Sequence, residues 1–114
     1  MDTRAKKLAT AQLLRKTREV TAANLPIGSS FIPYDILLYL FHCQSTGETL
    51  SVKSLFTSLP YSEMGTRYHF KRLIENGWIE LVPDANDARI KNCKPTEKFK
   101  TRFGAIVEEL SKVD

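Results

Sequence analysis

Basic and aromatic side chains recur at helical spacing between Ser62 and Asn76, and their chemistry suits the binding of a polyanion. At 100° per residue, Arg67, Tyr68 and Lys71 lie on one arc, with Arg72 at its edge. The opposite arc, which is expected to face a core, consists of Thr66, Phe70, Leu73 and Ile74. A guanidinium group can bind guanine O6 and N7 or a phosphate, and ammonium and phenol groups can bind phosphates. This segment is therefore a candidate for contacting a nucleic acid. The alternative is a solvated helix face without a partner.

Two further features of the segment concern its first turn. Ser62 is expected to cap the helix, and together with the first backbone amides it would form an anion site. Gly65 lies inside the helix, where it costs about 1 kcal/mol relative to Ala. A close approach of the helix backbone to DNA, or to the preceding helix, would explain this glycine. The candidate DNA contacts of the helix are Ser62, Met64, Gly65, Arg67, Tyr68, Lys71 and Arg72.

A second candidate site is the stretch PDANDARIK, from Pro83 to Lys91, which joins two segments of strand-like sequence. Asp87 can accept hydrogen bonds from turn amides and pair with Arg89, which would set the direction of the guanidinium group. Asp84 is expected to cap the turn where the first strand ends. Arg89 and Lys91 are therefore further candidate contacts, with Asp84 and Asp87 stabilising the loop. The alternative is a hairpin with its own surface ion pair, worth about 0–1 kcal/mol.

The sequence carries no pattern typical of catalysis or of metal binding. His42 and His69 fall in different predicted helices, and the five glycines are too scattered for a phosphate-binding loop. Cys43 and Cys93 form no CxxC pair, so we expect buried thiols, and their role stays open. We therefore expect no catalytic residue, no metal and no cofactor.

The elements that position these residues follow from periodicity and from turn signals. Helices are predicted for residues 3–24, 33–45, 52–58, 62–76 and 96–112, strands for residues 78–82 and 89–94, and one short strand at residues 49–50. This order predicts a mainly α fold with a small β-hairpin (α+β), namely a winged helix-turn-helix flanked by N- and C-terminal helices. A chain of 114 residues is long enough for one core, so we expect a single domain over residues 1–114. Its predicted parts are a basic helix at residues 3–24, a winged core at residues 32–94 and a C-terminal helix at residues 95–112.

The net charge of +4 is concentrated at the N-terminus. Residues 1–24 contain Asp2 and Glu19 against Arg4, Lys6, Lys7, Arg15, Lys16 and Arg18, so they account for the whole surplus. This charge fits either a polyanionic partner or a solvated helix face. The apolar stripe of the same helix is too thin to fold alone, so we expect it to pack on another element or on another chain. No apolar run approaches the roughly 20 residues of a membrane span, and we expect a cytoplasmic protein without membrane contact.

The region from Ile32 to Leu110 resembles the MarR family of bacterial regulators (multiple antibiotic resistance type). The resemblance is carried by Asp84, by the Asp87-Ala88-Arg89 triplet and by the Thr96-Glu97-Lys98 run that opens the next helix. Upstream, Lys71 to Glu80 is similar to the end of the family's recognition helix and its entry into the wing. The chain departs from the family pattern at Ala88, Pro95 and Phe99, and in its shorter C-terminal helical part.

The resemblance implies a sequence-specific regulator that binds double-stranded DNA as a homodimer. Helix 62–76 would enter the major groove, and the wing (residues 83–90) would place Arg89 at the minor groove. We expect residues 3–24 and 96–112 to form a shortened dimer stalk. A small-molecule effector has no support in the sequence.

A second hypothesis is a winged-helix module that binds a protein and has no sequence-specific contact with DNA. It is favoured by Glu63, Glu75 and Glu80, whose negative charges partly offset the positive charge of the predicted DNA-binding surface. The operator, the sign of regulation and the identity of an effector stay open at this point.

Overall fold

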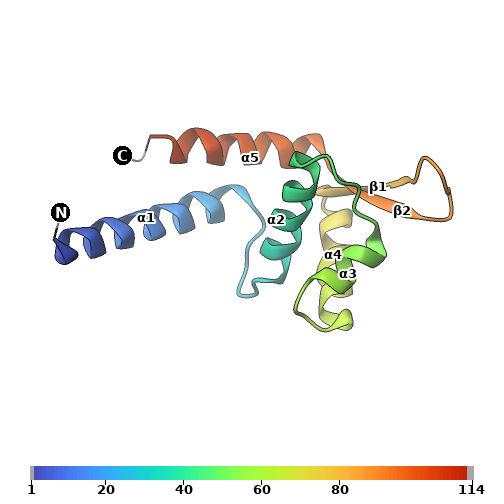
Figure 1. Ribbon diagram of the computed structural model, residues 1–114, viewed down its shortest axis with the longest axis horizontal. Helices are drawn as coiled ribbons and strands as arrows, with labels where there is room; N and C mark the ends of the chain where they lie inside the picture. The colour runs from blue at the N-terminus through green and yellow to red at the C-terminus, as the bar shows by residue number, and fades with distance from the viewer. Residues whose placement is uncertain (1, 113–114) are drawn as a thin grey trace.

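Five helices and one two-stranded antiparallel sheet follow one another in the computed structural model, which describes residues 2–112 (Figure 1). The elements are α1 (Thr3–Asn24), α2 (Ile32–Ser45), α3 (Val52–Ser58), α4 (Glu63–Glu75), β1 (Ile79–Pro83), β2 (Lys91–Pro95) and α5 (Glu97–Leu110). The mainly α fold with a small β-hairpin is therefore confirmed.

The helix boundaries are set by short polar side chains and by glycine. The hydroxyl groups of Ser51, Ser62 and Thr96 each accept a hydrogen bond from a backbone amide in the first turn of α3, α4 and α5. Gly77 follows α4 with φ = 79°, the left-handed conformation that L side chains disfavour, and its amide donates to the carbonyl of Ile74. Of these positions, Ser62 was predicted as a helix cap and Thr96 as the start of a helix.

The hairpin differs from the prediction at its loop. Strand β2 begins at Lys91, whereas a strand was expected from Arg89. The backbone from Asp84 to Ile90 forms the loop instead, because the Asp84 amide donates to the Ile90 carbonyl and the Ile90 amide donates to the Asp87 carbonyl. The first strand is also shifted by one residue, to Ile79–Pro83.

The short strand expected at residues 49–50 is reduced to one point of pairing with β2. Ser51 forms an isolated antiparallel bridge with Asn92, and the Cys93 amide donates to the Leu50 carbonyl at 2.8 Å. This pairing connects the start of α3 to the hairpin.

The core lies where α2 is surrounded by the other elements. Its fully buried side chains include Ile36, Leu37, Leu40, Leu55, Ile79 and Phe99. The ring of Phe41 stacks on Phe103 with centroids 3.9 Å apart, which joins α2 to α5. Cys43 and Cys93 are both buried, as expected, and burial raises the pKa of the Cys93 thiol to about 12.

Helices α1 and α5 extend together away from the winged core (Figure 1). Val20 and Thr21 near the C-terminal end of α1 are buried, but Leu8 and Leu14 are 60% and 64% exposed. The extents of 56 × 28 × 24 Å and the radius of gyration of 16.3 Å reflect this projection, since a compact chain of this length has a radius of about 13 Å. None of the helices within residues 2–112 combines the length and the apolar character needed to cross a bilayer.

Candidate nucleic-acid interface

Helix α4 is divided into a buried and an exposed face, as its sequence predicts. Thr66, Phe70 and Leu73 are buried, and Ile74 is half-buried. The exposed side chains are Met64, Arg67, Tyr68, Lys71, Arg72 and Glu75. The structure therefore places the candidate contacts of α4 at the surface, except Gly65, which is half-buried. It also places Ser62 there, as the cap of the helix.

Arg67 is held against α3. Its guanidinium group pairs with Glu63 at 2.6 Å and lies over the ring of Phe56, 5.3 Å from the centroid. Both side chains of the ion pair are largely exposed, so the pair is weak and a stronger anion can replace Glu63.

The structure gives a packing reason for Gly65. A β-carbon at this position would lie 3.1 Å from Oγ of Ser62 and 3.3 Å from Cδ1 of Ile32. The helix backbone at Gly65 thus lies close to its own cap and to the first residue of α2. The close packing of Gly65 against α2 therefore explains the glycine without DNA. The neighbouring helix is α2, whereas the preceding helix, α3, was expected.

The wing is organised by the carboxylate of Asp84. This group accepts hydrogen bonds from Nδ2 of Asn92 at 2.8 Å and from the amides of Asn86 and Asp87 at 3.0 and 3.2 Å. These bonds, that of Asn92 first, hold the pKa of Asp84 below its usual value. Asn92 is 5% exposed and was not predicted to matter. Its only signal in the sequence is a polar residue in a strand next to buried Cys93.

Arg89 is oriented by Asp87, as the sequence predicts. Nε and an Nη of Arg89 donate to the two carboxylate oxygens of Asp87 at 3.0 and 2.9 Å, and the Arg89 amide donates to the same carboxylate at 3.0 Å. This bidentate pair lowers the pKa of Asp87 and raises the pKa of Arg89. The Arg89 side chain remains 91% exposed. The guanidinium group is therefore fixed in direction while it stays accessible.

A hollow of about 360 Å³, here called the wing hollow, lies between the start of α3 and the wing. It is lined by Ser51, Val52, Lys53, Arg89, Ile90 and Lys91, and no carboxylate is among these residues. Lys53 was not predicted to belong to the site. It is 36 residues from Arg89 in sequence, and no local pattern reports that the two lie together.

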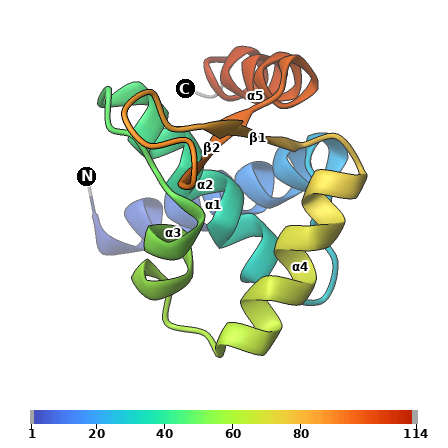
Figure 2. The ribbon, with the colours of Figure 1, turned by 90° about the vertical axis from the view of Figure 1, so that its right-hand side faces the viewer.

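The candidate elements share one side of the molecule. Figure 2 views the molecule from the right-hand side of Figure 1, and the wing loop, α3 and α4 all lie toward the viewer. Within residues 2–112, no group of three or more His, Cys, Asp or Glu side chains is arranged to hold a metal ion.

Comparison with known proteins gives matches in structure only, since neither a protein-family profile nor a curated protein sequence matches the chain. A mutant of MepR from S. aureus bound to an oligodeoxyribonucleotide has a TM-score of 0.73 and 18% identity, over 96% of this chain and 76% of that chain. The transcriptional regulator Tm0710 from Thermotoga maritima has a TM-score of 0.67 and 18% identity, over 96% and 72% of the two chains. The heme sensor protein PefR from Streptococcus agalactiae in complex with heme has a TM-score of 0.55 and 20% identity, over 98% and 78%. At these identities the likeness establishes the fold. This chain therefore has the fold of the MarR-type winged-helix regulators, the family that its wing sequence resembles.

Proposed function

We propose that this protein is a transcriptional regulator that binds double-stranded DNA in a sequence-specific manner. In this proposal α4 enters the major groove through Arg67, Tyr68 and Lys71, and the wing places Arg89 at the minor groove. The observation that carries the proposal is the exposed guanidinium group of Arg89, fixed by Asp87 on the same side of the molecule as α4. The mutant of MepR that shares this fold is bound to an oligodeoxyribonucleotide, which supports the same partner here.

The two acidic residues of the wing have a structural role in this proposal. Asp84 holds the loop through Asn92 and through backbone amides, and Asp87 aligns Arg89. A narrow minor groove has an enhanced negative potential that attracts a guanidinium group. The carboxylates therefore fix the loop without preventing Arg89 from reaching the groove.

Selection of bound duplexes from a random pool, followed by affinity measurements over a range of salt concentrations, tests this function. Each phosphate contact contributes about −0.9 to the slope of log K against log salt. Lys71→Ala and Arg89→Ala should each reduce the magnitude of the slope by about one. Arg102→Ala provides a matched control, because Arg102 is an exposed arginine of α5, a helix to which the proposal assigns no contact with DNA. If the slope is the same for wild type and both test variants, these contacts do not exist.

We further propose that the protein acts as a homodimer through a stalk formed by α1 and α5. The observation that favours this assembly is the exposed apolar surface of the two helices, contributed by Leu8, Leu13, Leu14 and Val107. A dimer would present two copies of α4 about one helical turn of DNA apart, so the selected site should be pseudo-palindromic.

A protein-binding module remains the second candidate, and the Glu63–Arg67 ion pair is the observation that favours it, since it offsets one charge of the predicted DNA-binding surface. Capture of partners from a lysate with and without nuclease treatment separates the two functions. Partners that persist after nuclease treatment, together with a random pool that yields no enriched sequence, would favour the protein-binding module.

A further inference from the structure

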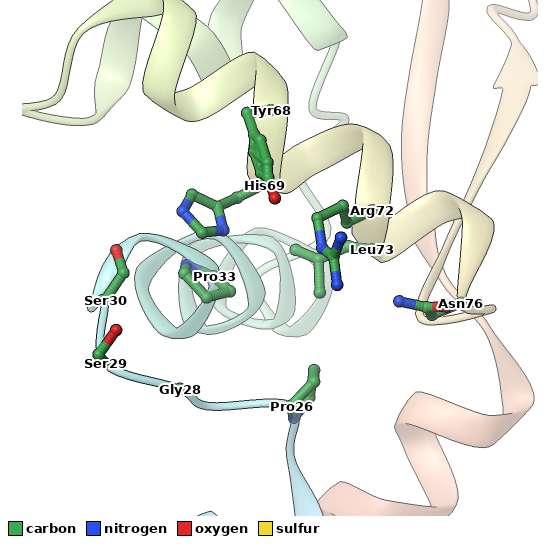
Figure 3. Close-up of a pocket in the computed structure, with 10 residues that line it drawn as sticks. All are labelled: Pro26, Gly28, Ser29, Ser30, Pro33, Tyr68, His69, Arg72, Leu73 and Asn76. Carbon is green, nitrogen blue, oxygen red and sulfur yellow. The ribbon is translucent and has the colours of Figure 1, made fainter.

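A second hollow lies on the other side of α4 from α3. It measures about 300 Å³ and lies between α4 and the connector formed by residues 25–31, which joins α1 to α2 (Figure 3). We call it the connector hollow. Its polar lining is contributed by Ser29, Ser30, Tyr68, His69, Arg72 and Asn76, and none of its ten lining residues is acidic.

The donors of the connector hollow come from two elements. Figure 3 shows the imidazole of His69 on the side of α4 nearer to Ser29 and Ser30, and the guanidinium of Arg72 about one turn farther along α4, extending toward the part of the connector that carries Pro26. The Arg72 guanidinium lies 5.7 Å from the centroid of the Tyr68 ring, and the rings of Tyr68 and His69 meet edge to face at 5.1 Å. Among residues 2–112, no carboxylate forms an ion pair with Arg72. The hollow thus offers a cation and several donors without a resident anion.

The geometry of DNA suggests what occupies this hollow. A helix with its side chains is about 10–12 Å across, and the major groove is about 12 Å wide. A helix inserted in the groove therefore has the phosphates of one strand along one flank and those of the complementary strand along the other. Figure 2 shows α4 with α3 on one flank and the connector on the other.

In the proposed complex, the wing hollow would lie against the backbone of one of these two strands. The backbone that separates a major groove from the adjacent minor groove belongs to a single strand. A protein with α4 in the major groove and its wing at the minor groove must cross that backbone between the two elements. Lys53, Arg89 and Lys91 surround the hollow at this crossing. The complementary strand then lies on the flank of α4 that carries the connector hollow.

We propose that the connector hollow binds a backbone phosphate of the DNA strand opposite to the one held at the wing hollow. The proposal rests on the proposed function and extends it to Ser29, Ser30 and His69, which no sequence pattern assigns. Arg72 supplies the charge, and the connector supplies hydroxyl donors. The connector would thereby become part of the DNA interface and link the bound strand to α1.

Chemical replacement of single phosphates tests this assignment. On a duplex selected from the random pool, each phosphate in turn is replaced by an uncharged methylphosphonate, and affinity is measured for wild type and variants. The informative variants are Arg72→Gln and Ser29→Ala for the connector hollow, and Lys53→Gln for the wing hollow. Ser29 is exposed and makes no hydrogen bond that supports α2, whereas Ser30 accepts one from the Ile32 amide, so Ser29 is the cleaner choice. Arg102→Gln is the matched control.

We expect one phosphate whose neutralisation weakens binding of the wild type about tenfold but weakens binding of Arg72→Gln less than about twofold. Neutralisation of this same phosphate should also weaken binding of Ser29→Ala less than it weakens binding of the wild type, which means that Ser29 is coupled to this phosphate. The phosphate coupled to Lys53→Gln should lie on the complementary strand. Arg102→Gln should show the full wild-type effect at every position.

Three outcomes would overturn the proposal while leaving DNA binding intact. Coupling of Arg72 and Lys53 to phosphates of the same strand contradicts the assignment of strands. A Ser29→Ala variant coupled to no phosphate removes the connector from the interface. An Arg72→Gln variant that weakens binding equally on every duplex indicates that Arg72 acts through the fold and contacts no single phosphate. If the wild type binds no duplex from the pool, the proposed function fails and this inference fails with it.

Discussion

At the scale of single residues, Asp84 is the group on which the shape of the wing depends. It receives three hydrogen bonds, one of them from the buried amide of Asn92, whose backbone also pairs with Ser51 at the start of α3. The orientation of the wing relative to α3 is thus set by a polar contact inside the hairpin. Asp84 thus holds the loop, and the exposed ion pair with Asp87 then orients the Arg89 side chain on it.

The lowered pKa of Asp84 makes the stability of the fold depend on pH. Because this pKa is lower in the folded state, the ionised carboxylate stabilises the fold above its unfolded pKa of about 3.9. The stabilisation is lost as the pH falls through the folded pKa. Asp84→Asn should therefore be less stable than wild type at pH 7 and should lose less stability between pH 7 and pH 3. Urea denaturation at the two pH values measures this difference.

A matched control for Asp84 is Glu108→Gln, since Glu108 is an exposed carboxylate on α5. This variant should lose as much stability on acidification as the wild type does. Asp87 still titrates in the Asp84→Asn variant, so its acid dependence should be reduced and not abolished. Equal acid dependence in wild type and Asp84→Asn would refute the role given to this carboxylate.

At the scale of elements, the joint between α4 and β1 depends on the backbone conformation of Gly77. A β-carbon at Gly77 would meet no atom within 4 Å, so the only obstacle to a side chain is φ = 79°. Gly77→Ala should lower the free energy of unfolding by about 1–2 kcal/mol. This joint positions the wing relative to α4, so the variant should also bind DNA more weakly than its stability loss alone explains.

The matched substitution is Gly104→Ala, which places the same methyl group in the helical interior of α5, again with no atom within 4 Å. Here alanine should raise the free energy of unfolding by about 0.5–1 kcal/mol, because glycine is a poor helix former. Thermal or urea unfolding of the two variants should give changes of opposite sign. Two changes of the same sign would mean that the conformation of Gly77 is not the cause.

At the scale of the whole molecule, the exposed leucines of α1 determine whether the chain acts alone. Sedimentation at micromolar concentration should show a species of about twice the 13.0 kDa chain mass. Leu14→Glu places a charge on the exposed apolar stripe and should shift the protein to the 13.0 kDa species. A wild-type protein that sediments only at 13.0 kDa would rule out the stalk.

Gln44→Glu is the control for the stalk, because it adds the same charge at an exposed position of α2, outside the proposed stalk. Its sedimentation should match that of the wild type. A dimer binds DNA with two copies of α4. Leu14→Glu should therefore also lose the preference for a pseudo-palindromic site, while it retains salt-dependent affinity for DNA.

Local sequence determines the order of the elements, their caps and the polarity of α4. Ser62, Thr96 and Gly77 act on backbone within a few residues of themselves, and the 3.6-residue period of α4 separates its buried from its exposed side chains without reference to the rest of the chain. The Asp87–Arg89 pair is likewise predictable, because two residues of separation bring the carboxylate and the guanidinium within reach.

Tertiary structure alone decided which distant residues share a site. Asn92 donates to Asp84, Lys53 lines the wing hollow together with Arg89, and Ser29 lines the connector hollow together with Arg72. Each of these pairs joins separate segments of the chain. The distance between such residues depends on how helices pack around α2, and no periodicity along the chain reports it. Gly65 likewise shows that local sequence does not identify a tertiary neighbour. Its sequence position indicated a close approach, and only packing revealed that the neighbour is Ile32.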